Sequence, residues 1–226
     1  MFQTWMVRPS PPIPPDQIAN LSLWVSADAG VTESGGIVTG WADQSGNANN
    51  LGNVSGNPTL VTNLINGLPA IDFRTSGRLR GTNLTASTIY AVVRTRSTSL
   101  GSSDSAVVEA TGGSLYSALN TGGGQWGSYF NAYRGAGQIL AANTSTIIAT
   151  ISSSGGSWFF RRNGAQVSTG SPATYVARSF VYVGNDGSET QQSKCYIAEI
   201  AAYSRQLTNQ ECAEIEIYLN NKYAIY

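Results

Sequence analysis

The last part of the chain has the clearest pattern of hydrophobic and polar positions. After Thr208, apolar residues recur at spacings of three and four, which predicts a single amphipathic helix. The apolar stripe consists of Cys212, Ile215, Leu219 and Tyr223. Thr208 and Glu211 stand three positions apart, the spacing of a capping box at a helix N-terminus. Glu214 and Glu216 are expected on the solvated face of this helix.

A strand precedes the helix, in the segment CYIAEIAAY that starts at Cys195. Successive residues of a strand point to opposite faces. Strict alternation therefore places Ile197, Glu199, Ala201 and Tyr203 on one face, and the residues between them on the other. Because the segment has so few polar residues, we expect both of its faces to be covered. Glu199 is expected to play a structural role near the rim of the sheet.

The rest of the chain consists of short apolar segments separated by breaks rich in glycine and serine. This pattern predicts many short strands and hence a β-sandwich. The predicted strands are residues 21–27, 37–42, 70–73, 88–94, 106–110, 115–119, 128–133, 146–152 and 180–185. Leu21, Leu23 and Val25 are expected on one face of the first. The dipeptide Asn163-Gly164 gives the strongest hairpin signal, because both positions tolerate a positive φ.

Several short motifs carry a resemblance to a known family. They follow one another as Leu23-Trp24-x-x-Ala27-Asp28, Trp41-x-Asp43-x-Ser45-Gly46-Asn47, Pro58-Thr59 and Ile65-Asn66-Gly67-x-Pro69-x-x-x-Phe73. In this order they resemble the concanavalin A-like, LamG-type jelly-roll domains of bacterial and phage proteins. The likeness continues downstream through residues 88–94, 158–168, 180–185 and 196–223. It implies an all-β, two-sheet antiparallel jelly-roll sandwich with one C-terminal α-helix.

The chain is expected to consist of an extended N-terminal arm, residues 1–17, and one jelly-roll domain, residues 18–226. Five prolines favour an extended path through the arm. The arm also carries large or apolar side chains, namely Phe2, Trp5, Met6, Pro12 and Ile13. Aromatic groups on a free terminus are a liability unless they are buried. We therefore favour an arm that docks on a partner, and a disordered tail is the alternative.

Charge and composition exclude some classes of function. Charged residues make up 12% of the chain, against about 25% in typical globular proteins. The surface must therefore be built from Ser, Thr, Asn, Gln and Gly, as is common in extracellular and virion proteins. Lys plus Arg equals Asp plus Glu, 13 each, so no basic footprint for nucleic acid exists. We expect neither a signal peptide nor a membrane-spanning segment.

The residue types that carry catalysis are scarce. The chain has no histidine, which removes the commonest general base and metal ligand. The carboxylate run Glu-x-Asp-x-x-Glu of the glucanase relatives is missing, and the strand acids Asp72, Glu109 and Glu199 occur singly. We therefore expect no catalytic residues and no cofactor. Cys195 and Cys212 should lie at opposite ends of the strand and helix, too far apart for a disulfide, as free and mostly buried thiols.

Two clusters of polar or aromatic residues admit a second interpretation. Asp28, Asp43 and Asn47 are compatible with a calcium site, but Asx-turns explain them without an ion, so no metal is expected. Residues 122–135 contain four candidate glycan-binding side chains. These are Trp126, Tyr129, Tyr133 and Arg134. Aromatic faces beside an arginine suit stacking on sugar rings, although alternating aromatic residues are also typical of a strand core, the interpretation we favour.

Three functions remain open. The favoured one is a non-enzymatic structural or interaction protein of a virus particle, such as a capsid decoration or tail surface protein. Its partners would be other virion subunits or a second copy of the chain, and its location the virion surface. The alternative is a lectin-like module that recognises polysaccharide, with a secreted location. A polysaccharide-degrading enzyme is the third possibility.

Overall fold

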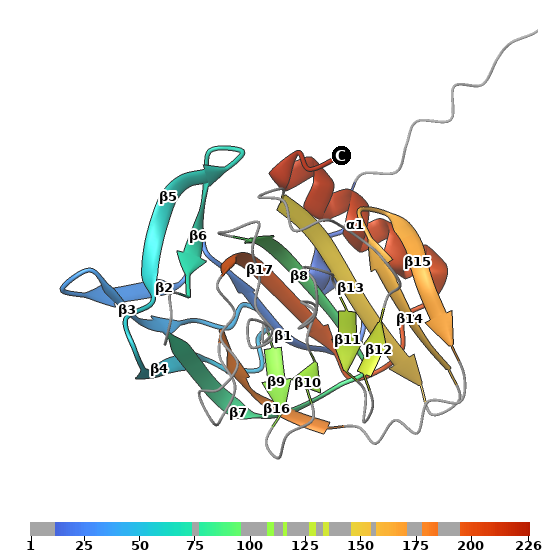
Figure 1. Ribbon diagram of the computed structural model, residues 1–226, viewed down its shortest axis with the longest axis horizontal. Coiled ribbons are helices and arrows are strands. Elements are labelled where there is room, and N and C mark those ends of the chain that lie inside the picture. Colours follow the sequence, from blue (N-terminus) through green and yellow to red (C-terminus); the bar gives the residue numbers. More distant parts are fainter. Residues whose placement is uncertain are drawn as a thin grey trace, which may run out of the picture.

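The computed structural model describes residues 12–73, 77–95, 108–110, 115–116, 127–129, 133–135, 146–154, 157–170, 178–184 and 195–226. Two antiparallel sheets pack face to face, and one helix covers the outer face of one sheet (Figure 1). The predicted all-β, two-sheet antiparallel sandwich with a C-terminal helix is confirmed. No helix in the described part of the chain is long and apolar enough to cross a membrane.

Sheet A is built around the strand that precedes the helix. Its order is β15-β14-β13-β8-β17-β6-β5, and β1 also pairs with β17. The strands are β1 (Leu21–Ser26), β5 (Thr59–Ile65), β6 (Leu68–Asp72), β8 (Thr88–Thr95), β13 (Thr146–Ser154), β14 (Ser157–Arg162), β15 (Ala165–Gly170) and β17 (Cys195–Tyr203). Asn163 and Gly164 have φ of 48° and 80°, so the predicted hairpin turn between β14 and β15 is confirmed.

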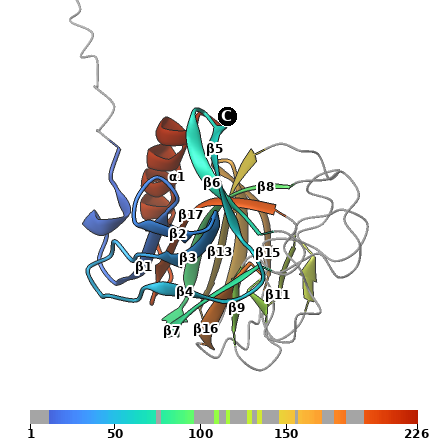
Figure 2. The same ribbon diagram turned by 90° about the vertical axis from the view of Figure 1, so that its left-hand side faces the viewer.

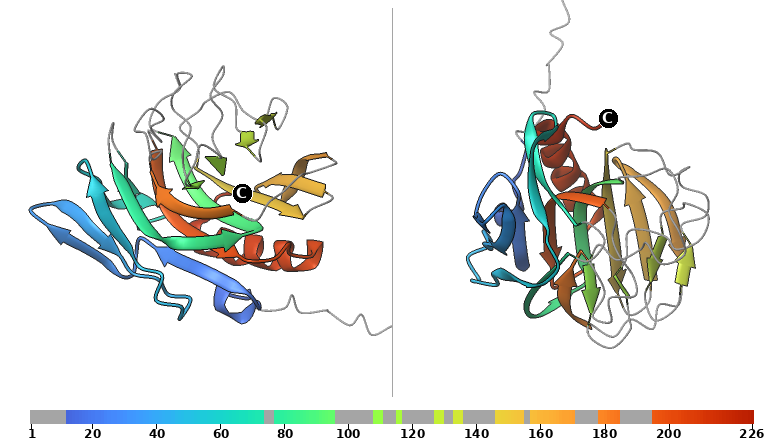
Figure 3. Two further views of the ribbon diagram at one scale, coloured as in Figure 1. Left: turned by 90° about the horizontal axis from the view of Figure 1, so that it is seen from below. Right: turned by 60° about the vertical axis from the view of Figure 1, so that its left-hand side comes forward.

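Sheet B has the order β10-β9-β16-β7-β4-β3-β2. Its strands are β2 (Val31–Ser34), β3 (Ile37–Trp41), β4 (Leu51–Ser55), β7 (Arg78–Ala86), β9 (Val108–Ala110), β10 (Leu115–Tyr116) and β16 (Arg178–Val183). Figure 3 shows β2 and β3 at the end of the sandwich opposite to β14 and β15. The strands β2, β4 and β7 were not predicted, because polar residues and glycines interrupt their apolar patterns.

Two apolar clusters hold the layers together. The first lies between the sheets and includes Trp41, Phe73, Leu79, Phe160 and Ile197, all buried. The second lies between sheet A and the helix α1 (Asn209–Tyr223). It contains the predicted stripe of Cys212, Ile215, Leu219 and Tyr223. The short 3₁₀ helix η1 (Pro15–Gln17) leads into Ile18, which joins this second cluster beside α1 (Figure 2).

β17 is covered on both faces, as predicted, but its alternation is not strict. A register shift against β8 falls between Ile197 and Glu199. Ile197, Ile200 and Ala202 contribute to the cluster between the sheets, whereas Ala198 and Ala201 contribute to the cluster under α1. The expectation that Ile197 and Glu199 share a face is therefore wrong. The bulge turns the Glu199 carboxylate towards α1, where it bonds to Tyr223.

A similar shift affects β1, whose pairing with β17 is irregular between Leu21 and Leu23. Leu23 and Val25 lie in the cluster between the sheets, but Leu21 packs against the cluster under α1. The prediction that all three share one face is therefore wrong for Leu21. In both strands an extra residue changes the face on which the following side chains lie.

The helix α1 begins as predicted. The Glu211 N–H donates to Thr208 Oγ1 at 3.3 Å, and the Thr208 N–H donates to Glu211 Oε2 at 2.8 Å, which completes a capping box. Glu216, expected on the solvated face, is only 1% exposed. Cys195 and Cys212 are free and buried, as predicted.

Glu211 should make the stability of the fold depend on pH. Its carboxylate accepts hydrogen bonds from Arg205 and from the helix cap, which lower the pKa of Glu211 from 4.5 to about 2. A carboxyl group whose pKa is depressed by folding stabilises the protein above its unfolded pKa, and this contribution disappears as the pH falls towards 2. We expect denaturant unfolding to show this acid-dependent loss in the wild type. In Glu211→Gln the loss should be smaller; an equal loss in both proteins would contradict the assignment.

Candidate functional site

The four predicted glycan-binding residues are only partly covered by the structure. Trp126 lies outside the described residues. Tyr129 ends β11 (Gly127–Tyr129) and is the register partner of Tyr133, which begins β12 (Tyr133–Gly135). Arg134 is the partner of Ser128. The predicted single strand over residues 128–133 is therefore wrong, since its two ends belong to opposite strands of a ribbon. The binding role of these residues stays a prediction.

The predicted docking arm is described only at its end. Phe2, Trp5 and Met6 lie outside the described residues. Pro12 is exposed, whereas Ile13 packs against the cluster under α1 of its own chain. The carbonyl of Pro15 accepts a hydrogen bond from the Tyr203 hydroxyl at 3.0 Å. The end of the arm is thus attached to the domain that follows it, and docking of the arm on a partner stays a prediction.

The candidate calcium ligands form turns and an ion pair. Asp43 Oδ1 accepts from the Ser45 N–H at 2.9 Å, which makes an Asx-turn, and from the Trp24 N–H at 2.9 Å. Asp28 instead pairs with Lys222 at 3.1 Å. Burial opposes ionisation of Asp28, but hydrogen bonds from Ser26 and Lys222 outweigh it and hold the Asp28 pKa below its usual value. Among the described residues, no group of three or more acids or cysteines converges as a metal site would.

Glu199 lies at the centre of a buried polar network between sheet A and the end of α1. Its Oε1 accepts from Trp24 Nε1 at 2.7 Å. Its Oε2 accepts from Lys222 Nζ and from the Tyr223 hydroxyl, both at 2.8 Å. Burial and the Glu199 charge raise the pKa of Tyr223 far above its usual value, so its hydroxyl stays protonated and donates. Both oxygens of this buried carboxylate are therefore satisfied by fixed donors.

The same network brings together groups that resemble catalytic pairs. Lys222 Nζ lies 2.8 Å from Ser26 Oγ, the arrangement of a serine and its base. Ser26 Oγ also contacts Asp28 and Glu199, so two carboxylates flank one hydroxyl. However, Lys222 is engaged in ion pairs with both carboxylates, at 3.1 Å from Asp28 and 2.8 Å from Glu199. Ser26 and Glu199 are each only 1% exposed, so substrate has no access to them.

A second buried ion pair joins sheet A to α1. Arg161 donates from Nε to Glu216 Oε1 at 2.8 Å and from Nη2 to Glu216 Oε2 at 2.7 Å. Arg161 Nη2 also donates to the carbonyl of Gly164 in the β14–β15 turn. This two-point geometry is the one that an arginine and a carboxylate prefer. The pair is structural, and it explains why Glu216 is buried.

The outer face of sheet B, which is turned away from the first cluster, carries a row of register partners that includes aromatic and charged residues. Leu79 and Val183 are register partners in the core between the sheets. Their chain neighbours Arg80 and Tyr182 are also partners and lie on the opposite, outer face. The same row of register partners extends across the sheet in both directions. In order, its members are Thr32, Gly40, Gly52, Arg80, Tyr182 and Glu109.

The ring of Tyr182 contacts two arginines of β7. The guanidinium carbon of Arg78 lies 4.6 Å from the centre of the Tyr182 ring, and that of Arg80 lies 5.8 Å from it. Arg80 is exposed, while Arg78 and Tyr182 are half-buried. Cation–π contacts of this kind fix the side chains relative to one another. The sheet therefore presents an ordered aromatic and cationic group to solvent.

Two glycines lie next to Tyr182 and Arg80 in the row of register partners. Gly52 follows Arg80 in the row, and Gly40 follows Gly52. A side chain at Gly52 would meet nothing within 4 Å, so the space above it is open. At Gly40 a Cβ would approach Thr32 Oγ1 to 2.9 Å. Gly52 therefore forms an open floor next to Arg80, where a ligand can approach the backbone, whereas Thr32 occupies the space above Gly40. We call Thr32, Gly40, Gly52, Arg80 and Tyr182 the sheet B platform.

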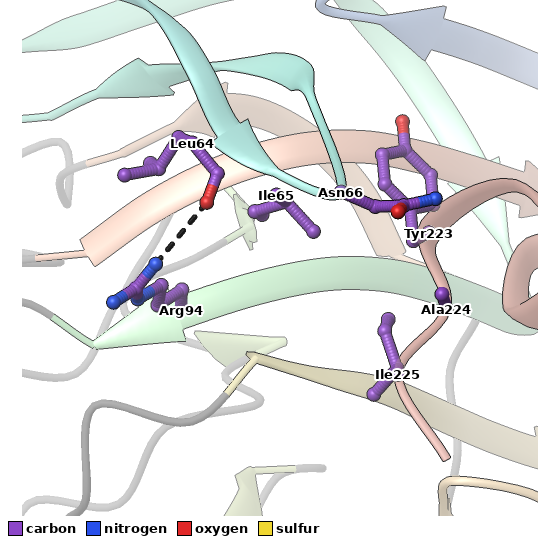
Figure 4. A pocket seen from close by; sticks show the side chains of 7 residues that line it. All are labelled: Leu64, Ile65, Asn66, Arg94, Tyr223, Ala224 and Ile225. Atoms are coloured by element: carbon purple, nitrogen blue, oxygen red, sulfur yellow. Dashed lines mark hydrogen bonds between the residues drawn. The ribbon is translucent and has the colours of Figure 1, made fainter.

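A cleft of about 390 Å³ lies on another part of the molecule, between the β5–β6 hairpin, the end of β8 and the residues after α1 (Figure 4). Arg94 and Ile225 face it from opposite sides. Arg94 Nη1 donates to the carbonyl of Leu64 at 3.2 Å, and Asn66 Nδ2 donates to the carbonyl of Lys222 at 3.0 Å. These bonds link the three walls of the cleft to one another. Its polar groups help to hold the fold together.

Sequence reasoning missed the sheet B platform. Its members come from strands that are distant in sequence, and three of those strands were not predicted. The signal that could have found it is the alternation Arg78-Leu79-Arg80, in which two cations flank an apolar residue. A second signal is the pair Gly40 and Gly52, each next to a buried apolar residue.

Comparison of the structure with solved structures finds related sandwiches. Domain 4 of an extracellular GH43 arabinanase from Geobacillus stearothermophilus, in complex with arabinotriose, has a TM-score of 0.62 and 14% identity over 87% of this chain and 98% of that one. Trypanosoma rangeli sialidase has a TM-score of 0.62 and 16% identity over 88% of this chain, but only 33% of its own length is matched. The chain shares the fold of these β-sandwich domains.

A third similar structure is the receptor binding domain of a botulinum neurotoxin of the C/D mosaic serotype. Its TM-score is 0.61 at 11% identity, over 88% of this chain and 51% of that one. Comparisons with protein-family models and with curated protein sequences find no match. The LamG-type resemblance of the motifs is thus shown only at the level of a β-sandwich fold.

Proposed function

We propose that this chain is a non-catalytic carbohydrate-binding domain, and that the sheet B platform is its binding surface. One observation carries the proposal. Tyr182, Arg80 and Gly52 are successive register partners on the outer face of sheet B, and the space above Gly52 is open. Recognition of a sugar requires an apolar face for the ring and polar groups for its hydroxyls. The platform offers both, on a rigid sheet.

Each member of the platform would have a physical role. The ring of Tyr182 would pack against the apolar face of a sugar, and the Arg80 guanidinium would donate hydrogen bonds to its hydroxyl oxygens. The floor at Gly52 would let the sugar approach the sheet without a clash. Because strands and cation–π contacts hold these groups before binding, little conformational entropy is lost when a ligand arrives.

The similar structures support the same proposal. One of them is a domain of a glycan-degrading enzyme with a bound arabinose oligosaccharide, and another is a receptor-binding domain. The expectation of a virion protein finds no such support, so we adopt the carbohydrate-binding alternative. The non-catalytic part of the proposal is supported by the engagement of two neighbouring carboxylates, Asp28 and Glu199, with Lys222.

Tyr182→Ala tests the proposal. Calorimetric titration of the purified chain with neutral oligosaccharides, arabinotriose among them, should detect binding. In Tyr182→Ala we expect the affinity to fall at least tenfold, because truncation of a central aromatic contact typically costs 2 kcal/mol or more. The matched control is Tyr226→Ala, which removes the exposed last tyrosine of the sequence, outside the platform.

Two results would contradict the proposal. One is no binding to any member of a panel that covers neutral and acidic glycans. The other is an equal loss of affinity in Tyr182→Ala and Tyr226→Ala while both proteins remain folded by circular dichroism. Turnover of a polysaccharide by the wild-type chain would overturn its non-catalytic part.

A further inference from the structure

We propose that the sheet B platform selects glycans that carry an anionic group, a carboxylate or a sulfate, and that Arg80 is the residue that selects them. This inference rests on the proposed function of the same surface. The reason lies in the charges of the platform. Its charged member is Arg80, and Arg78 lies next to it; both guanidinium carbons are within 6 Å of the Tyr182 ring centre.

Arg80 is the better placed of the two arginines. It is exposed, whereas Arg78 is half-buried. Its register neighbours are Tyr182 on one side and Gly52 on the other. An anionic substituent on a sugar packed against Tyr182 would therefore reach a planar guanidinium over an open floor. A guanidinium binds carboxylates and sulfates through paired, charge-assisted hydrogen bonds.

The described glutamates can be placed relative to the platform. Glu199, Glu211, Glu214 and Glu216 belong to β17 and α1, across sheet A from sheet B. Glu33 is the register partner of Val38, a core residue, and so sits on the face opposite to that of Gly40. Glu109 is the register partner of Tyr182 on β9, the strand on the other side of β16 from β7. Arg80 and the glycines Gly52 and Gly40 therefore lie together on one side of Tyr182 in the row.

A pair of polysaccharides that differ only in charge provides the test. Polygalacturonate and its carboxyl-reduced, neutral form have the same backbone, and a sulfated galactan represents the other anionic group. At low ionic strength we expect the wild type to bind one or both anionic polymers at least tenfold more tightly than the neutral form. This preference should disappear in 1 M NaCl, where charges are screened beyond about 3 Å. Arg80→Gln should remove the preference, so that the variant binds the anionic polymers no more tightly than it binds the neutral one.

The control is Arg162→Gln, which removes one positive charge from β14 and should leave the preference unchanged. The inference is overturned if the neutral polymer binds as tightly as the anionic ones, or if Arg80→Gln and Arg162→Gln lower the preference equally. Either result leaves carbohydrate binding itself intact. Failure to bind any charged or neutral polymer would overturn the proposed function together with this inference.

Discussion

Replacement of Glu199 by alanine should lower the free energy of unfolding by about 3–5 kcal/mol, the usual cost when one partner of a buried ion pair is removed. The carboxylate accepts from the Trp24 indole, the Lys222 amine and the Tyr223 hydroxyl. Without it, the Trp24 indole and the Tyr223 hydroxyl lose their acceptor in a largely buried site, and Lys222 keeps only Asp28 and Ser26 as partners. The last turn of α1 would lose its main attachment to sheet A. Urea unfolding followed by tryptophan fluorescence measures the change.

Glu199→Gln is the informative control. Glutamine keeps an oxygen for one of the donors and nearly preserves the volume, but it removes the charge that Lys222 faces. Its cost should lie between zero and that of the alanine variant. A loss of less than about 1 kcal/mol in Glu199→Ala would show that the network contributes little, and the structural role of Glu199 would have to be abandoned.

Glu216→Ala should have an effect of similar size, again about 3–5 kcal/mol, because it leaves the buried guanidinium of Arg161 without its carboxylate. The double variant Arg161→Met with Glu216→Leu removes both charges and replaces them by apolar side chains. Such replacements are often neutral or stabilising, so the double variant should be more stable than Glu216→Ala. Chemical denaturation of the three proteins compares them. A double variant less stable than Glu216→Ala would contradict this account of the pair.

The parts of the fold that depend on local sequence could be predicted. The capping box at Thr208, the stripe under α1 and the Asn163-Gly164 turn all rest on residues within a few positions of one another. The bulge near Glu199 could not be predicted, because it depends on how β17 pairs with β8. The burial of Glu216 likewise depends on Arg161, a residue 55 positions away. The local sequence indicates which residues alternate between the two faces of a strand. The position of a β-bulge depends on how that strand pairs with its neighbour, which the local sequence does not contain.

The candidate site shows the same limit more strongly. The residues singled out from the sequence, Trp126 and its neighbours, form an aromatic-rich segment that is easy to see in a linear chain. The sheet B platform is assembled from single residues of β2, β3, β4, β7 and β16. Its glycines contribute because they have no side chain above the backbone. A sequence pattern records what is present in one segment. It cannot show that Gly40, Gly52 and Arg80 stand in one row.

We propose that glycan binds at the sheet B platform and at no other part of the described surface. Amide spectra of chain labelled with ¹⁵N-glycine test it most directly, during titration with arabinotriose or with the glycan that binds most tightly in the panel. We predict that the signals of Gly40 and Gly52 shift, while those of Gly67 beside the Arg94 cleft and Gly164 in the β14–β15 turn stay in place. Shifts at Gly67 or Gly164 with Gly40 and Gly52 unmoved would contradict the claim.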